Sequence, residues 1–305
     1  MTKIQNMKEH VNRVRSTQHP TPGEVIGHGE WKGVTRKGVN WTVHAGDCLS
    51  ILQSHESNTF SCVITSPPYF WLRDYGVNGQ LGKESSVDGY VHSLCTVMDE
   101  VNRVLKKDGV LFLNLGDTYY SGKGQSHGVD PKSSKRRFGL RAVDRSGGLG
   151  IGLRAKTIIG VPWRVAIEMC NRGWILRSPI IWYRKDSLPE PVEDRPRRTY
   201  EYVLMFVKHR KYYFNLKPLK EKGEFDLWTI SARPKSNNGL GTAPFPNELV
   251  QRCLSIGCAP GGKVLDPFAG SGTTLRVALQ AGHPATGIDL NLVFCKYMIE
   301  QLRMF

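Results

Sequence analysis

Short apolar runs alternate with longer amphipathic segments along most of the chain. The runs are continuous rather than alternating apolar and polar, and they lie at 41–45, 60–65, 110–115, 178–183, 202–207, 264–265 and 285–288. Continuous runs of this length are typical of strands that are covered on both faces, as in parallel sheets. The pattern therefore predicts a sheet buried between two layers.

The segments between these runs carry apolar residues at helical spacing. In 90–106 one stripe collects Val91, Leu94, Val97, Met98, Val101 and Leu105. The sequence 107–109, Lys-Asp-Gly, is expected to end this helix. Further helices are predicted at 162–172, 246–258, 273–281 and 292–302. Strands that alternate with helices indicate an α/β fold with a mostly parallel sheet.

Three stretches depart from this alternation. Residues 1–40 are polar and rich in glycine, and they predict an N-terminal arm or a loose hairpin ahead of a main domain at 41–305. Residues 117–156 carry nine basic and three acidic side chains and predict a long inserted loop. Residues 184–245 mix basic with aromatic side chains, which suits phosphate contact together with base stacking.

The net charge of the chain indicates which class of partner it binds. Lys and Arg number 42 against 27 Asp and Glu, which gives +15 at pH 7. An excess of this size favours a nucleic-acid partner, although a basic surface kept for solubility would give the same count. In the two basic stretches, a solvated face over an ordinary strand is the alternative to a binding role. The residues expected to contact nucleic acid are Arg136, Arg137, Arg141, Arg197 and Arg198.

Other classes of protein are disfavoured by composition. No run reaches the roughly 18 apolar residues of a membrane-spanning helix, and the first residues lack the apolar core of a signal peptide. Seven scattered cysteines without a Cys-x-x-Cys pair argue against a disulfide framework and a structural zinc site. The histidines show no metal-ligand spacing either. We therefore expect a cytoplasmic protein without a metal.

A glycine-rich turn joins a predicted strand to a helix at 266–274, with the sequence Asp-Pro-Phe-Ala-Gly-Ser-Gly-Thr-Thr. Gly270 and Gly272 allow a ligand to approach the backbone closely. The helix that begins near Thr273 offers free N–H groups to a carboxylate or phosphate. Asp289 ends the next strand, where a carboxylate can accept both hydroxyls of a ribose. The unit predicts a site for a nucleoside cofactor, and the missing G-x-G-x-x-G pattern argues against a nicotinamide.

A second motif, Thr-Ser-Pro-Pro-Tyr at 65–69, follows the strand predicted at 60–65. The two prolines are stiff and lack N–H groups, so their carbonyl oxygens point in fixed directions. With the Ser66 hydroxyl before them and the Tyr69 ring after them, they would form a pocket for a flat molecule that bears an NH₂ group. A turn that ends a strand and packs a tyrosine is the purely structural alternative.

Together the two motifs resemble those of the DNA amino-methyltransferases, which transfer a methyl group from S-adenosylmethionine to an exocyclic amino group. The Ser-Pro-Pro-Tyr motif comes first and the glycine turn follows about 200 residues later, an order that resembles the β class of this family. The resemblance covers roughly 41–305. It implies a Rossmann-like methyltransferase fold with a mostly parallel mixed sheet and a circularly permuted motif order.

The resemblance also implies roles for individual residues. Those expected to hold the cofactor are Asp47, Asp266, Phe268, Gly270, Ser271, Gly272, Thr273 and Asp289. Among them, Asp289 would bind the ribose hydroxyls, Thr273 the methionine carboxylate, and Asp47 would lie near the adenine. The catalytic residues would be Ser66, Pro67, Pro68 and Tyr69.

In this reading Ser66 and the carbonyl of Pro67 accept the two hydrogens of the target amino group, and Tyr69 stacks on a base that has left the duplex. No strong base is needed first, because the amino proton becomes acidic only after the methyl transfer. In this family Ser-Pro-Pro-Tyr accompanies N4-cytosine methylation more often, and Asp- or Asn-Pro-Pro-Tyr accompanies N6-adenine methylation.

The sequence therefore predicts methylation of cytosine N4 in double-stranded DNA, with adenine N6 as the alternative. Methylation of RNA or of a protein amide, and a non-catalytic DNA-binding module, are further alternatives. A homodimer, a companion restriction endonuclease and a prokaryotic or phage origin would also fit the resemblance.

Overall fold

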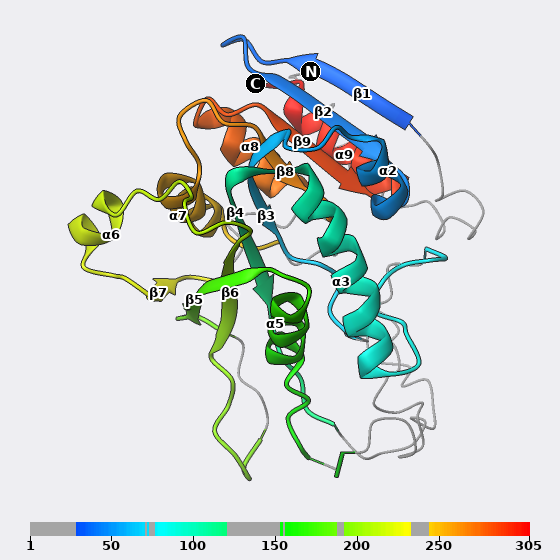
Figure 1. Cartoon of the computed structure of the whole chain (residues 1–305), viewed down its shortest axis with the longest axis vertical. Helices are drawn as coiled ribbons and strands as arrows, with labels where there is room; N and C mark the ends of the chain where they lie inside the picture. Colours follow the sequence, from blue (N-terminus) through cyan, green and yellow to red (C-terminus); the bar gives the residue numbers. More distant parts are fainter. Residues whose placement is uncertain are drawn as a thin grey trace, which may run out of the picture.

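A computed structural model describes residues 29–70, 72, 77–120, 153–154, 156–187, 192–232 and 244–305. Within them, nine strands form one mixed sheet in the order β1-β2-β9-β8-β3-β4-β6-β5-β7 (Figure 1). The strands are β1 (Gly29–Val34), β2 (Asn40–Ala45), β3 (Phe60–Thr65), β4 (Leu105–Leu115), β5 (Ile175–Arg184), β6 (Tyr200–Val207), β7 (Leu227–Ile230), β8 (Val264–Asp266) and β9 (Ala285–Asp289).

The five strands from β2 to β4 in this order are parallel, and they form the centre of the sheet. Strand β6 runs antiparallel to both of its neighbours, and β1 runs antiparallel to β2. The prediction of a mostly parallel mixed sheet is confirmed. The helices in the described residues are α2 (Cys48–Ser54), α3 (Val87–Val104), α5 (Val161–Asn171), α6 (Lys217–Lys222), α7 (Asn247–Gly257), α8 (Thr273–Gln280) and α9 (Leu292–Leu302).

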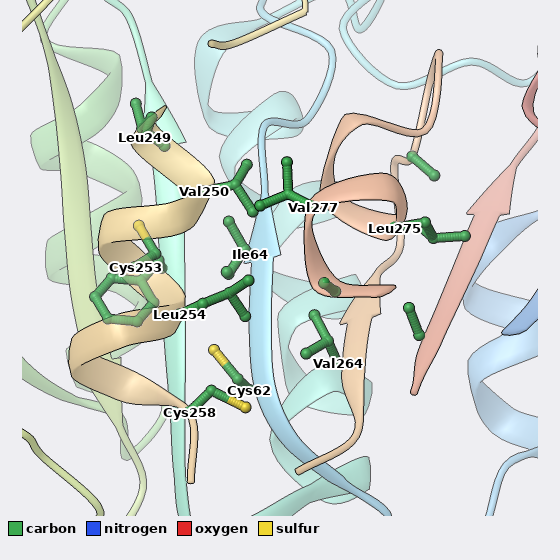
Figure 2. Packing of buried hydrophobic residues seen from close by; sticks show 14 of the residues in the cluster. Cys62, Ile64, Leu249, Val250, Cys253, Leu254, Cys258, Val264, Leu275 and Val277 are labelled. Carbon is green, nitrogen blue, oxygen red and sulfur yellow. The ribbon is translucent and has the colours of Figure 1, made fainter. Parts of the chain in front are cut away.

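Two apolar layers cover the sheet. Helices α2, α3 and α5 pack together in one layer, and α7, α8 and α9 pack in the other. Every residue of β3 is buried between these layers. Its Cys62 and Ile64 face Val250 and Leu254 of α7 in the second layer (Figure 2), whereas Val63 belongs to the first. Burial on both faces explains why the apolar runs are continuous in the sequence.

The predicted elements are present, with shifted ends. The largest shift concerns the junction after α3, where the residues Lys-Asp-Gly at 107–109 lie inside β4 rather than in a turn. The helix ends at Val104, and the N–H of Leu105 closes its last turn on Val101. The helical stripe and the strand share Leu105, which is fully buried, so the sequence pattern alone did not separate them.

The N-terminal part of the described chain forms a hairpin. Strand β1 pairs with β2 through a tight turn closed by hydrogen bonds between Thr35 and Val39 and between Gly38 and Thr35. Of the two forms predicted for 1–40, residues 29–40 adopt the hairpin, and β1 joins the sheet ahead of residue 41. Residues 1–28 lie outside the described part. No helix in the described ranges has the length and apolarity needed to cross a membrane.

Candidate active site

A cavity of about 920 Å³ opens at the carboxyl ends of the parallel strands. The two sequence motifs meet there, because Ser66 to Tyr69 follow β3 and the glycine turn follows the neighbouring β8. Strand β9 adds Asp289 at its end, and Asp47 follows β2. In open α/β sheets, the usual ligand site is the crevice outside the carboxyl ends of parallel strands, where the order of the strands reverses.

The cavity unites most of the predicted site residues. It is lined by all four residues of the Ser-Pro-Pro-Tyr motif and by every expected cofactor residue except Gly272. Of the basic residues expected to contact nucleic acid, Arg198 lines the cavity, while Arg197 is exposed outside it. Arg136, Arg137 and Arg141 lie outside the described residues.

Asp266 ties the two motifs together. Its carboxylate accepts hydrogen bonds from Thr65 Oγ1 at 2.7 Å, from Thr274 Oγ1 at 2.6 Å and from the N–H of Phe268 at 3.1 Å. Burial raises the pKa of Asp266 to about 6, against the opposing effect of these donors. The side chain therefore holds the end of β3 against the start of α8, in addition to lining the cavity.

Asp289 is held from two sides. One carboxylate oxygen accepts the N–H of Gly270 and the other accepts the N–H of Asn291, both at 2.8 Å. Burial raises the pKa of Asp289 to about 6. Because each carboxylate oxygen has more than one acceptor site, both oxygens can also accept the hydroxyls of a ribose.

The glycine turn sets the start of α8. Gly272 caps the helix with φ 78°, and a Cβ there would lie 2.4 Å from Met298 Cγ. Gly272 thus serves the turn and its packing, which explains why it does not line the cavity. The next residue, Thr273, has a buried hydroxyl with no hydrogen-bond partner in the described part of the chain.

This orphaned hydroxyl lies in the first turn of a helix, where backbone N–H groups also lack partners. Together they fit a carboxylate, and the carboxylate of Asp289 fits a ribose. Asp47 lines the same cavity and caps α2 by accepting the N–H of Ser50 at 2.9 Å. The residues present therefore fit the methionine carboxylate and the ribose of S-adenosylmethionine.

The half of the cavity that the Ser-Pro-Pro-Tyr motif forms is held in place by side chains that the sequence did not predict as site residues. Tyr90 donates to the carbonyl of Pro68 at 2.9 Å. Ser66 Oγ donates to Tyr69 Oη at 3.3 Å, and Tyr69 Oη donates to Glu201 Oε2 at 2.7 Å. Burial, reinforced by the charge of Glu201, raises the pKa of the Tyr69 phenol well above its usual value, so the phenol is neutral.

Glu201 and Asn114 complete a polar network behind Tyr69. Asn114 Nδ2 donates to Glu201 Oε2 at 3.2 Å, and Arg184 Nη1 lies 2.9 Å from Glu201 Oε1. In the sequence Asn114 is the single polar side chain of the apolar run 110–115 in β4, and Glu201 is the single charged side chain of β6. That interruption is a signal that could have identified them, since polar groups buried in a sheet need partners.

Comparisons with known proteins agree with this geometry. A family model described as DNA methylase, for the N6 and N4 enzymes, matches residues 60–300. The Type II methyltransferase M.SmaI of Serratia marcescens is 39% identical over 266 residues, 84% of this chain and 89% of that protein. M.Cfr9I of Citrobacter freundii is 38% identical over 269 residues, 86% of this chain and 87% of that protein.

Two solved structures share the fold. A Thermus thermophilus protein described as a putative DNA modification methylase, in complex with S-adenosyl-L-methionine, is 25% identical with a TM-score of 0.57, over 85% of this chain and 93% of that one. The cytosine-N4-specific PvuII DNA methyltransferase is 20% identical with a TM-score of 0.64, over 86% and 89%. The chain belongs to the N6 and N4 DNA methylase family, as its two motifs predicted.

Proposed function

We propose that this DNA methyltransferase transfers its methyl group to the N4 amino group of cytosine in double-stranded DNA. One observation carries the proposal: a single cavity contains both an anchored Ser-Pro-Pro-Tyr motif and the acceptors for a nucleoside cofactor. Serine at the first position of the motif favours cytosine by resemblance. Adenine N6 is the second candidate, because the cavity offers the same acceptors to either amino group.

The methyl donor is S-adenosylmethionine, whose sulfonium supplies an electrophilic methyl group when it is bound. Asp289 would hold the ribose, and Thr273 with the start of α8 would hold the methionine carboxylate. Phe268 lines the same cavity. Holding both reactants in one cavity removes much of the entropic barrier to the transfer.

The target nitrogen is a poor nucleophile because its lone pair is delocalised into the base. Hydrogen bonds from its two N–H groups to Ser66 Oγ and the Pro67 carbonyl favour a tetrahedral nitrogen and stabilise the positive charge that develops on it. Tyr69 would stack on the extruded base, whose removal from the duplex costs a few kcal/mol. Gly116 lets the Tyr69 ring lie close to the backbone, since a Cβ on residue 116 would lie 2.8 Å from Tyr69 Cε2.

The two basic stretches meet beside the cavity, which supports DNA contact there. Lys156, at the end of the inserted loop, pairs with Asp194 at 2.6 Å. The guanidinium groups of Arg195 and Arg198 lie 3.8 and 5.7 Å from the ring centroid of Tyr119, at the start of the loop. We propose that this junction contacts DNA near the extruded base. A companion restriction endonuclease, suggested by the Type II relatives, and a homodimer remain predictions.

The base is identified by nucleoside mass spectrometry. The protein would be incubated with mixed-sequence duplex DNA and S-adenosylmethionine, and the DNA then digested to nucleosides. N4-methylcytosine is the expected product. N6-methyladenine would overturn the cytosine assignment and keep the family chemistry. An unmodified digest from protein that binds the cofactor would favour an RNA or protein-amide substrate or a non-catalytic role.

A further inference from the structure

A chain of hydrogen bonds leads along the cavity wall from the catalytic serine to the carboxylate of Glu201. It runs from Ser66 Oγ to Tyr69 Oη over 3.3 Å and from Tyr69 Oη to Glu201 Oε2 over 2.7 Å. Each hydroxyl in this chain donates to the next group. The chain therefore has the polarity that is needed to carry a proton from the cavity to Glu201.

Amino-methyl transfer leaves one proton without an acceptor. When the nitrogen forms its bond to the methyl carbon and the carbon–sulfur bond breaks, the nitrogen becomes positively charged and must lose one of its hydrogens. Ser66 Oγ is a hydrogen-bond acceptor for that hydrogen, but a serine hydroxyl is not a base unless it passes its own proton on.

We propose that Glu201 is the terminal proton acceptor of the reaction and acts through Tyr69 and Ser66. As the amino proton moves to Ser66 Oγ, the serine proton moves to Tyr69 Oη and the tyrosine proton moves to Glu201 Oε2. Each hydroxyl gains one proton and loses one, and the carboxylate becomes neutral. The inference rests on the proposed function but is independent of whether the base is cytosine or adenine.

The surroundings of Glu201 suit this role. Its side chain is 14% exposed, and its carboxylate pairs with Arg184 and accepts a hydrogen bond from the Asn114 amide. The Tyr69 phenol is neutral and can relay a proton without becoming a tyrosinate. A weak base suffices, because the proton on the methylated nitrogen is strongly acidic. The negative charge of a carboxylate also stabilises the cation that develops on the nitrogen.

The other carboxylates that line the cavity in the described residues are engaged elsewhere. Each accepts a hydrogen bond from a group other than Ser66 and Tyr69, and they are Asp47, Asp117, Asp186, Asp266 and Asp289. Asn114 Oδ1 lies 3.3 Å from Tyr69 Oη, but an amide oxygen is not a proton acceptor of useful strength. Glu201 is thus the acid to which the chain leads.

The test compares single-turnover methyl transfer by Glu201→Gln, Tyr69→Phe and the double variant. Glutamine still accepts the hydrogen bond of Tyr69, and phenylalanine still stacks on the base, so positioning is preserved in both. We expect each single variant to lower the transfer rate roughly 100-fold, in the range of general-base contributions. The double variant should be no slower than the slower single one, and DNA and cofactor affinities should stay within about threefold.

Glu248→Gln is the matched control. Glu248 pairs with the buried Arg252 at 2.6 Å on α7 and does not line the cavity, so this variant should lose an ion pair and keep the wild-type rate. Because Glu201→Gln leaves Arg184 without its carboxylate, Tyr69→Phe provides the independent variant that does not disturb that pair.

A transfer rate within about threefold of wild type in both single variants would overturn the proposal, because solvent would then take the proton. Losses that multiply in the double variant would overturn it as well, because the residues would not act as one chain. A wild-type protein that transfers no methyl group to DNA would instead overturn the proposed function, and the inference with it.

Discussion

Two aspartates that look equivalent in the sequence have different roles, which their hydrogen bonds reveal. Asp266 directs its carboxylate to Thr65, Thr274 and the loop backbone, so it builds the site. Asp289 uses two backbone N–H groups to hold a carboxylate that also lines the cavity, so it can bind a ligand. The sequence patterns located both acids, whereas their tasks depend on partners that are far apart in the chain.

Substitution of Ser66 by alanine should separate catalysis from cofactor binding. The hydroxyl lies in the Ser-Pro-Pro-Tyr half of the cavity, and it is the acceptor proposed for the amino group. We expect Ser66→Ala to lose at least about 100-fold in transfer rate while its S-adenosylmethionine affinity, measured by calorimetry, stays unchanged. An equal loss of cofactor affinity would contradict the assignment of Ser66 to the base.

The pKa of Asp289 predicts a pH-dependent cofactor affinity. Because the pKa is raised to about 6, the carboxyl is protonated below that pH and no longer offers a charged acceptor to the ribose. We expect affinity to weaken as pH falls through about 6, and Asp289→Asn to bind weakly without this dependence.

A fall in pH has the opposite effect on the stability of the fold. The folded chain binds this proton more tightly than the unfolded chain, so Asp289 alone makes the fold more stable below about pH 6 and less stable above it. Unfolding therefore does not mimic the predicted loss of affinity. A cofactor affinity that is equal at about pH 5 and about pH 7.5 would contradict the role of Asp289.

At the scale of elements, the site depends on which strands lie side by side. Strands β3 and β8 are about 200 residues apart in sequence but adjacent in the sheet, so the two motifs that follow them share one cavity. Strand β9 brings Asp289 next to the glycine turn, as the hydrogen bond to Gly270 shows. The loops that follow these strands line one cavity because parallel strands have their carboxyl ends at the same edge of the sheet.

The start of α8 can be tested through Gly272. In Gly272→Ala the new Cβ would meet Met298 and adopt a left-handed φ of 78°, at a combined cost of about 2–4 kcal/mol in the free energy of unfolding. Gly282→Ala is the control, since its φ is 84° but no atom lies within 4 Å of the added Cβ. Denaturant unfolding should show the larger loss for Gly272→Ala, and equal losses would contradict the packing argument.

Much of this arrangement was predictable from sequence, and the omissions have physical causes. Short continuous apolar runs located the central strands, and amphipathic stripes located the long helices. Strand β1 was anticipated only as part of a loose hairpin, and the elements that were missed, α2, α6 and β7, are short, with patterns too weak to identify. Glu201 and Asn114 were missed because their function arises from contacts with Tyr69, which lies in the loop that follows β3.

On the scale of the whole molecule, excess positive charge is combined with a local cavity. The net charge of +15 acts over long distances on any polyanion, while the cavity supplies the specific chemistry. The contacts of Tyr119 with Arg195 and Arg198 bring the edges of the two basic stretches together near the cavity. The overall charge thus favours DNA binding, and the cavity determines what happens to one base.

This division predicts different salt responses for the two ligands. If several lysines and arginines meet phosphates, DNA affinity should fall at least tenfold between about 50 and 200 mM salt. S-adenosylmethionine affinity, which depends on buried acceptors, should change little over that range. Fluorescence anisotropy and calorimetry measure the two affinities. A DNA affinity that is insensitive to salt would contradict a phosphate-contacting surface.

The most direct test of the account follows one labelled methyl group. Wild-type protein and Ser66→Ala would be given duplex DNA and S-adenosylmethionine with a deuterated methyl group, and the DNA analysed by mass spectrometry. We predict a labelled amino-methylated base with wild type, and almost none with Ser66→Ala at equal cofactor occupancy. Unlabelled DNA with wild type, or equal labelling by Ser66→Ala, would contradict the claim that this cavity joins the cofactor to the base.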